Sequence, residues 1–272
     1  SDATIAVMGI SALIEGEEGA AISSDANGDR FEIDLPKSQV DYIKTLRDKA
    51  GSKPIILVVN SGSALNLTEV EPYVDAILYA WYLGEQGGNA IADIIFGNSN
   101  PSGKLPITIP KSLSHLPPYD NYNMENRTYK FTNHQPMYPF GFGLSYSIFS
   151  YSDLSIKKDK IDIGDSIDLN FEIFNNSDFV GEEIIQVYIK DINASFRTPN
   201  SSLIFFKRIQ LNAGEKKKIN LVIDDNMMAS FNEKGDQVVE PGNFKIFVGG
   251  SSPGVRSKEL GKMIKEVNFI VQ

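Results

Sequence analysis

Three carboxylates crowd one short stretch of this sequence. Glu15, Glu17 and Glu18 fall within four positions, and no Lys or Arg occurs between Ser11 and Arg30. An acidic surface normally interleaves basic residues, because like charges repel one another. Crowded carboxyl groups tend to hold a proton at higher pH, which is the condition that a general acid requires near neutrality. The cluster indicates acid–base chemistry, and an acidic surface loop is the alternative.

The cluster follows an apolar run at residues 4–9, and two similar runs occupy residues 54–60 and 76–81. Such runs predict strands that are buried on both faces. Apolar residues recur at helical spacing within residues 35–51, and a second helix is predicted over residues 86–96. Strand, helix and strand at this spacing predict a mostly parallel α/β sheet. Ligands of such sheets bind at the carboxyl ends of the strands, where the acidic cluster begins.

The rest of the chain has a different pattern. Residues 111–149 contain many aromatic residues, which predicts an ordered connection and not a flexible linker. Residues 150–272 alternate apolar and polar residues between turn signals, which is typical of a fibronectin-like β-sandwich. The predicted fold is therefore α/β plus all-β, with an α/β sandwich domain over residues 1–110 and the β-sandwich over residues 150–272.

Composition excludes several function classes. The net charge of −9 argues against a nucleic-acid partner, because such surfaces depend on Lys and Arg clusters. The chain has no Cys and only two histidines, His115 and His134, which leaves no thiolate metal site and argues against a His-based triad. We expect no metal and no cofactor. No apolar stretch is long enough for a membrane span, so we also expect no membrane partner.

Several longer motifs resemble one known family. They are AWYLGEQGGNAIAD at 80–93, FGNSNPSGKLP at 96–106, YPFGFGLSY at 138–146, NNSDFVGEEIIQVY at 175–188 and PGNFKIFVGGSS at 241–252. The first two resemble the C-terminal α/β domain of family-three glycoside hydrolases, the β-glucosidase and β-xylosidase family. The other three resemble that family's lead into, and strands of, its fibronectin type III-like domain.

The resemblance implies a role for the acidic cluster. In the family, a loop at this position supplies the acid/base glutamate of a retaining exo-β-glycosidase, in a Gly-Glu context that Gly16-Glu17 resembles. Glu17 is the first choice for this role, Glu15 the second and Glu18 the third. Asp29 and Arg30 resemble the family's Asp-Arg pair, which we expect to brace the loop through an ion pair. Trp81 has two interpretations, a core residue or a platform for sugar.

The resemblance also implies what this chain lacks. The family's aspartate nucleophile lies on an N-terminal TIM barrel, and neither eight strand-helix units nor the nucleophile motif occurs here. Residues 4–9 resemble an internal strand of the α/β domain, so we expect the C-terminal part of a longer enzyme that is inactive alone. The expected substrate is a β-linked glycoside or oligosaccharide, and the expected location is periplasmic or secreted, with the cytoplasm and homodimerisation left open. The alternative is a noncatalytic carbohydrate-binding or scaffold module.

Overall fold

The structure is a computed structural model that describes residues 1–15 and 30–272. The chain forms two compact units. Unit 1 consists of Ser1–Ser99 and Ile109–Pro118, and unit 2 consists of Asn100–Thr108 and Tyr119–Gln272. The short segment Asn100–Thr108 therefore belongs with unit 2, although it lies between two parts of unit 1 in the sequence. The domain boundaries given above, at 110 and 150, stay a prediction.

In its described residues, unit 1 is built on a parallel sheet of three strands, in the order β1-β2-β3. The strands are β1 (Thr4–Gly9), β2 (Ile55–Asn60) and β3 (Ala76–Tyr79). Ile55, Leu57, Val58 and Val59 of the central strand are fully buried, so β2 contributes apolar side chains to both faces of the sheet. The predicted α/β class is confirmed.

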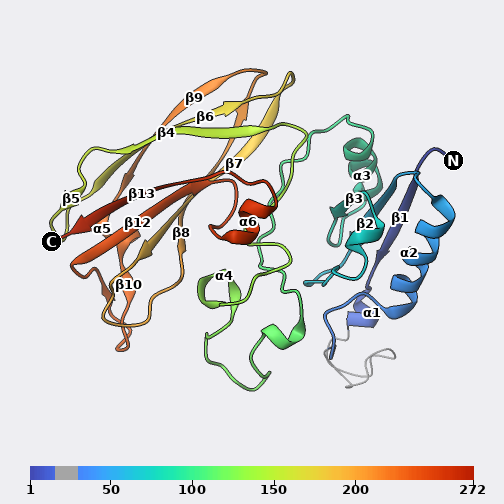
Figure 1. The fold of residues 1–272 in the computed structure, drawn as a ribbon, viewed down its shortest axis with the longest axis horizontal. Coiled ribbons are helices and arrows are strands. Elements are labelled where there is room, and N and C mark those ends of the chain that lie inside the picture. Colours follow the sequence, from blue (N-terminus) through green and yellow to red (C-terminus); the bar gives the residue numbers. More distant parts are fainter. Residues whose placement is uncertain (16–29) are drawn as a thin grey trace. The chain divides into compact units, whose positions relative to one another are not determined.

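The longest helix of unit 1 is α2 (Lys37–Ala50), which packs against β1 (Figure 1). Gln39 fixes the two elements together, because its side-chain amide donates to Gly9 O at 2.7 Å and accepts from Gly9 N at 2.8 Å. The remaining helical segments are α1 (Ala12–Glu15), η1 (Glu71–Tyr73), α3 (Gly87–Ile95) and η2 (Leu113–His115). In the described residues, no helix has the length and apolar character needed to cross a bilayer.

One expectation about the sheet is wrong. The apolar runs at residues 4–9 and 76–81 predicted burial on both faces, yet Ile5 is 44% exposed, Val7 is 56% exposed, and no residue of β3 is fully buried. The side chains of Ile5 and Val7 point to the same face of β1, which is an edge strand of the described sheet. Within the described residues of unit 1, nothing covers this face of β1 sufficiently to bury it. An apolar run thus indicates a surface that favours burial, but packing against another element decides whether burial occurs.

Unit 2 is a mostly antiparallel β-sandwich with two main sheets, in which only the pair β5 and β13 is parallel. One has the order β5-β13-β12-β7-β8 and the other the order β4-β6-β9, and β10 and β11 form a separate hairpin. The strands are β4 (Phe149–Ile156), β5 (Lys160–Ile161), β6 (Ile167–Asn175), β7 (Gly181–Asp191), β8 (Ser202–Leu211), β9 (Lys216–Ile223), β10 (Ser230–Phe231), β11 (Gln237–Val238), β12 (Gly242–Gly249) and β13 (Ile264–Val271). Three short helices complete the unit: α4 (Thr128–Phe131), α5 (Asp225–Met228) and α6 (Val255–Glu259).

The sandwich core follows the alternation seen in the sequence. Ile167, Leu169, Phe171 and Ile173 of β6 are buried and alternate with partly exposed residues. They pack with buried residues of β7, β12 and β13 in one apolar cluster. The predicted fibronectin-like β-sandwich is confirmed.

Aromatic residues order the chain that leads into the sandwich. The rings of Tyr129 and Phe140 stack with centroids 4.4 Å apart, and Tyr129 also meets the edge of Tyr188 on β7. Tyr138 and Phe142 form a second stacked pair at 5.7 Å. Ring packing therefore accounts for these four aromatic residues of the connection, and Tyr129 joins it to the sandwich.

Candidate functional site

The three parallel strands of unit 1 end at one edge of the sheet. Gly9 pairs with Asn60, and Val59 pairs with Tyr79. Two further backbone hydrogen bonds, Ile10 N to Asn60 O at 2.9 Å and Ala80 N to Val59 O at 2.8 Å, hold the loops that follow. Residues 10–15, 61–64 and 80–82 therefore start from the same edge, where ligands of parallel sheets bind.

Glu15 and Tyr82 meet at this edge. The Tyr82 hydroxyl lies 2.6 Å from Glu15 Oε2 and 3.0 Å from Ile10 O. A phenol has one proton to donate. Of the two oxygens, the Glu15 carboxylate is the closer and the stronger acceptor, so Tyr82 donates to it. Burial, together with this hydrogen bond to Glu15, raises the pKa of Tyr82 above its usual value. Tyr82 is thus a proton donor that holds one carboxylate oxygen of Glu15.

Gly62 leaves the space that this contact requires. A Cβ at this position would lie 2.7 Å from Tyr82 Cε2 and 3.1 Å from Glu15 Oε2. The first distance is shorter than van der Waals contact allows, so a larger residue would displace the Tyr82 ring. The loop after β2 therefore permits the approach of the loops after β1 and β3.

A second group of contacts braces the loop after β2. Arg30 Nη2 donates to Ser63 Oγ at 2.9 Å and to Ala64 O at 3.3 Å. The Tyr79 hydroxyl donates to Ser63 O at 2.8 Å and accepts from Leu65 N at 2.9 Å. Burial raises the pKa of Tyr79 to about 12, so its phenol stays protonated at neutral pH. Arg30 Nη1 is buried and has no hydrogen-bond partner among the residues that the structure describes.

Trp81 has an unusual backbone conformation for its residue type. Its φ is 59°, in the left-handed region that large side chains rarely adopt. Its ring lies against Tyr79, with centroids 4.7 Å apart. The side chain is half-buried, so it is neither a fully buried core residue nor a fully exposed platform. Strained backbone of this kind concentrates at functional sites, which marks the end of β3 as part of the candidate site.

The residues expected from the sequence divide into two groups. Glu15 and Arg30 both lie at the carboxyl edge, Glu15 bound by Tyr82 and Arg30 by Ser63. Glu17, Glu18 and Asp29 lie outside the described residues. Sequence reasoning missed Tyr79, Tyr82 and Ser63 as members of the site. The signal that would have found them is their position directly at the carboxyl ends of the second and third strands.

A cavity of about 550 Å³ lies beside Arg30 in unit 1. Its wall includes Ile10, Ile14, Phe31, Glu32 and Lys37, so it combines apolar surface with charges of both signs. Across residues 1–15 and 30–272, no group of three or more His, Asp or Glu side chains is placed to hold a metal ion. The functional groups of the described site are the carboxylate of Glu15, the phenols of Tyr79 and Tyr82, and the guanidinium of Arg30.

Sequence comparisons match both units. The profile described as "Glycosyl hydrolase family 3 C-terminal domain" matches residues 1–146, and that described as "Fibronectin type III-like domain" matches residues 183–252. A periplasmic β-glucosidase of Salmonella typhimurium is 35% identical over 268 residues, which cover 94% of this chain and 34% of the relative. A xylan 1,4-β-xylosidase of Xylanibacter ruminicola is 36% identical over 257 residues, covering 94% of this chain and 29% of the relative.

Solved structures give the same result. A β-glucosidase from Listeria innocua in complex with glucose superposes with a TM-score of 0.81 at 29% identity, over 99% of this chain and 36% of that protein. A GH3 β-glucosidase from Bifidobacterium adolescentis has a TM-score of 0.81 at 29% identity, over 98% of this chain and 39% of that protein. The chain spans about a third of the length of the curated relatives that it matches.

Proposed function

Because this chain belongs to the family of glycosyl hydrolase family 3 C-terminal domains, we propose that it is the C-terminal portion of a retaining, exo-acting β-glycosidase. In this proposal it supplies the general acid/base carboxyl group. The aspartate nucleophile lies on a TIM barrel of the same protein, outside these 272 residues. The isolated chain is then inactive.

The observation that carries the proposal is the position of Glu15. Its carboxylate lies at the carboxyl edge of a parallel sheet, held by Tyr82, and the acidic stretch that continues to Glu18 begins there. This edge is where ligands of such sheets bind, so the acidic stretch starts at the expected place for a site. The exposed Ile5 and Val7 on β1 also favour a unit that packs against further structure in the whole protein.

The chemistry requires two carboxyl groups with different tasks. In a retaining glycosidase they lie about 5 to 5.5 Å apart. The nucleophile attacks the anomeric carbon while the acid protonates the departing glycosidic oxygen, and the same group then removes a proton from the water that releases the sugar. Glu17 is the proposed acid/base residue, with Glu15 second and Glu18 third. The hydrogen bond from Tyr82 already occupies one oxygen of Glu15, which supports Glu17 over Glu15.

The substrate is a β-linked glycoside. The names of the relatives point to β-glucosides or β-xylosides, and one of those relatives is periplasmic, which supports a location outside the cytoplasm. Asp29 and Arg30 serve in this proposal to brace the loop that carries the acidic stretch. Arg30 donates to Ser63 and Ala64 in the loop after β2, and these contacts support a bracing role for Arg30.

The first experiment uses the 272-residue chain itself. It should not hydrolyse aryl β-glucosides or β-xylosides, because the nucleophile is absent. Appreciable turnover by the purified chain would contradict the proposal.

The second experiment assigns the acid/base residue in the intact protein. Glu17→Gln should slow alkyl glycosides far more than aryl glycosides with good leaving groups, since the latter need little protonation. Azide should restore the rate on activated substrates. If Glu15→Gln or Glu18→Gln gives this pattern and Glu17→Gln does not, the assignment moves to that residue.

A second candidate function is noncatalytic carbohydrate binding. Tyr119 and Tyr122 are 85% and 88% exposed, whereas Tyr129 and Phe140 pack inward. Exposed tyrosine rings are suited to stacking on sugars. Calorimetric binding of soluble β-linked oligosaccharides that is lost in Tyr119→Ala and Tyr122→Ala but kept in Glu17→Gln would favour this function over catalysis.

A further inference from the structure

Trp81 follows strand β3 in a backbone conformation that does not itself call for a tryptophan. Its φ of 59° lies in the left-handed region, which strains a residue that carries a Cβ and suits glycine. Such strain persists where surrounding contacts hold the backbone in place, and it concentrates at binding sites. The indole ring therefore has to be explained by what it contacts.

The indole ring is supported by a tyrosine whose position is fixed. The ring centroids of Trp81 and Tyr79 lie 4.7 Å apart, with the ring planes tilted by 53°. The Tyr79 hydroxyl donates to Ser63 O and accepts from Leu65 N, so both ends of the Tyr79 side chain are held. Trp81 is only half-buried, which leaves part of its ring open to solvent. A supported ring with an open surface is suited to stacking on the apolar face of a pyranose.

A carboxylate lies close to this ring. The residue after Trp81 is Tyr82, whose hydroxyl lies 2.6 Å from Glu15 Oε2. Burial first, and the nearby Glu15 carboxylate in addition, raise the pKa of Tyr79, so Glu15 and Trp81 are neighbours of the same tyrosine.

The Glu15 carboxylate has one oxygen to spare. Tyr82 takes Oε2, and within residues 1–15 and 30–272 no hydrogen bond is made to Oε1. A carboxylate oxygen is a strong acceptor for a hydroxyl proton. An aromatic ring beside an unused carboxylate oxygen matches the two faces of a sugar, because a pyranose has an apolar C–H face and an equatorial rim of hydroxyl groups.

We propose that Trp81 and Glu15 form a saccharide subsite at the end of β3. The pyranose stacks on the indole ring, and one of its hydroxyl groups donates to Glu15 Oε1. Tyr82 is a positioning residue, because it holds Glu15 and does not touch the sugar. The inference rests on the proposed glycosidase function and deepens it, since it gives Glu15 a binding role and leaves the acid/base role with Glu17.

The sugar in this subsite is that of the leaving group. The acid of a retaining glycosidase protonates the glycosidic oxygen, which departs with the leaving group. Glu15 precedes Glu17 by two positions, so covalent geometry keeps their Cα atoms within about 7 Å of each other. Groups next to the acid therefore face the departing sugar, whereas the sugar that stays attached belongs with the nucleophile.

The single tryptophan makes the subsite observable without turnover. The fluorescence of the 272-residue chain is titrated with cellobiose and with xylobiose, and sorbitol is the control because it is a polyol without a pyranose face. We expect a saturable change with the disaccharides, half-complete at millimolar concentration, and none with sorbitol. No saturable change up to about 100 mM disaccharide, or the same change with sorbitol, would overturn the proposal.

Two variants that keep the fluorescent probe test the carboxylate. Glu15→Ala should weaken disaccharide binding about tenfold, because it removes the acceptor of a charge-assisted hydrogen bond. Tyr82→Phe should weaken it about threefold, because Glu15 is then no longer held. Asp48→Ala is the matched control, since Asp48 is an exposed acid on α2 and should have no effect. Equal affinities of the Glu15→Ala and Asp48→Ala chains would contradict the role of Glu15.

Trp81→Gly separates binding from folding. Glycine relieves the left-handed backbone, so the variant should fold, while calorimetric binding of cellobiose should be lost. Binding that persists in a folded Trp81→Gly chain would overturn the proposal. If the variant does not fold, the titrations of the unaltered and Glu15→Ala chains decide the matter.

The subsite and the glycosidase function can fail separately. In the intact protein, Trp81→Ala should raise KM for disaccharides about tenfold and leave kcat/KM for methyl glycosides unchanged, because these carry no leaving-group sugar. An unchanged KM for disaccharides would remove the subsite and leave the glycosidase assignment standing. Disaccharide binding by the chain, together with an intact protein that hydrolyses no glycoside, would support the subsite and remove the glycosidase assignment.

Discussion

The Tyr82 hydroxyl lies 2.6 Å from the Glu15 carboxylate, although 67 positions separate the two residues in the sequence. The contact joins the loop after the first strand to the loop after the third. The contact fixes Glu15, the first residue of the acidic stretch, at the edge of the sheet. Its contribution to the free energy of unfolding of unit 1 can be measured.

Tyr82→Phe should lower the free energy of unfolding of unit 1 by about 1 kcal/mol, because it removes a hydrogen bond to a carboxylate at a partly exposed site. The chain's single tryptophan, Trp81, lies in unit 1, so its fluorescence during urea unfolding reports on that unit. Tyr42→Phe is the matched control on exposed surface of α2. Equal effects of the two substitutions would show that the Tyr82 contact contributes nothing.

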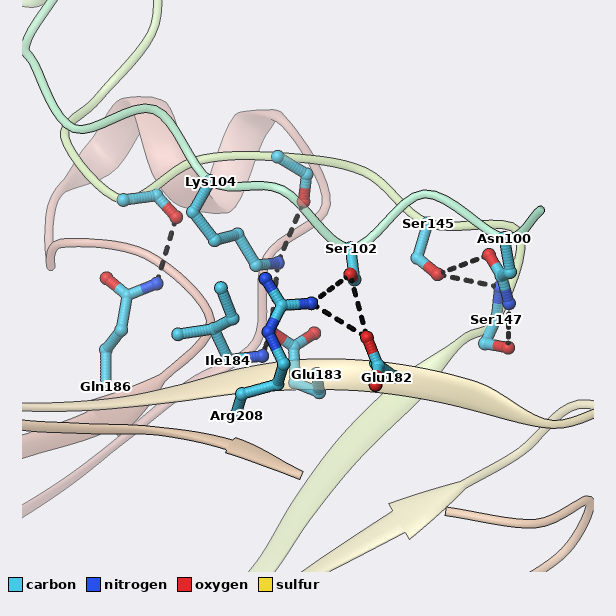
Figure 2. A network of polar contacts seen from close by, with 12 residues as sticks. Asn100, Ser102, Lys104, Ser145, Ser147, Glu182, Glu183, Ile184, Gln186 and Arg208 are labelled. Atoms are coloured by element: carbon cyan, nitrogen blue, oxygen red, sulfur yellow. Dashed lines mark hydrogen bonds and ion pairs between the residues drawn. The ribbon is translucent and has the colours of Figure 1, made fainter. Parts of the chain in front are cut away.

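Lys104→Met should destabilise unit 2 by about 3 kcal/mol or more, because the buried Glu183 carboxylate then loses the ammonium group that lies 2.9 Å from it (Figure 2). Arg208→Met is the control, since Arg208 pairs with Glu182 at 2.7 Å where both side chains are about half exposed. The control should cost less than about 1 kcal/mol. Chemical unfolding followed by the tyrosine circular dichroism of the sandwich provides the measurement, and similar losses in both variants would contradict the predicted effect of burial.

Stability should rise with pH between about pH 8 and pH 10 because of Lys262. Burial first, and then the positive charge of Lys104, lower the pKa of Lys262 from 10.5 in an ordinary lysine to about 8 in the folded chain, so in this window the unfolded chain binds a proton that the folded chain does not. The penalty for burying the charge is fully present below pH 8 and disappears as pH rises toward 10.5. We expect a gain of about 1 to 2 kcal/mol across the window, allowing for solvent screening.

Lys262→Met isolates this contribution, since it removes the titrating amine. The variant should show no such rise between pH 8 and pH 10 in urea unfolding of unit 2. A rise of the same size in the variant would assign the pH dependence to another group. The window ends at pH 10 because exposed tyrosines begin to ionise there.

Two core tyrosines should respond differently to loss of their hydroxyl groups. The Tyr151 hydroxyl is buried and has no hydrogen-bond partner in the described part of the chain, so Tyr151→Phe should leave stability unchanged or raise it by about 1 kcal/mol. The Tyr188 hydroxyl donates to Gln186 Oε1, so Tyr188→Phe should lower stability by about 1 to 2 kcal/mol. Thermal unfolding of both variants tests the pair, and a clear loss in Tyr151→Phe would reveal a hydrogen bond for its hydroxyl.

Much of the architecture follows from local pattern. Apolar runs predicted β1 and β2, helical spacing of Val40 and Ile43 predicted α2, and alternation predicted the sandwich strands such as β6. These features depend on side chains that are close in sequence, because backbone geometry alone decides which face each one occupies. The motifs between residues 80 and 252 were likewise sufficient to indicate the family.

The sequence by itself determined the two kinds of unit, the family and the crowding of carboxylates after the first strand. Only the tertiary structure decided that Glu15 meets Tyr82, that Ile5 and Val7 remain exposed, and that Lys104 holds Glu183 beside Lys262. Those relationships join segments that are distant in the chain. Hydrogen bonds, burial and charge interactions act through distances of a few ångströms, so they exist only once the folded backbone has brought the partners together.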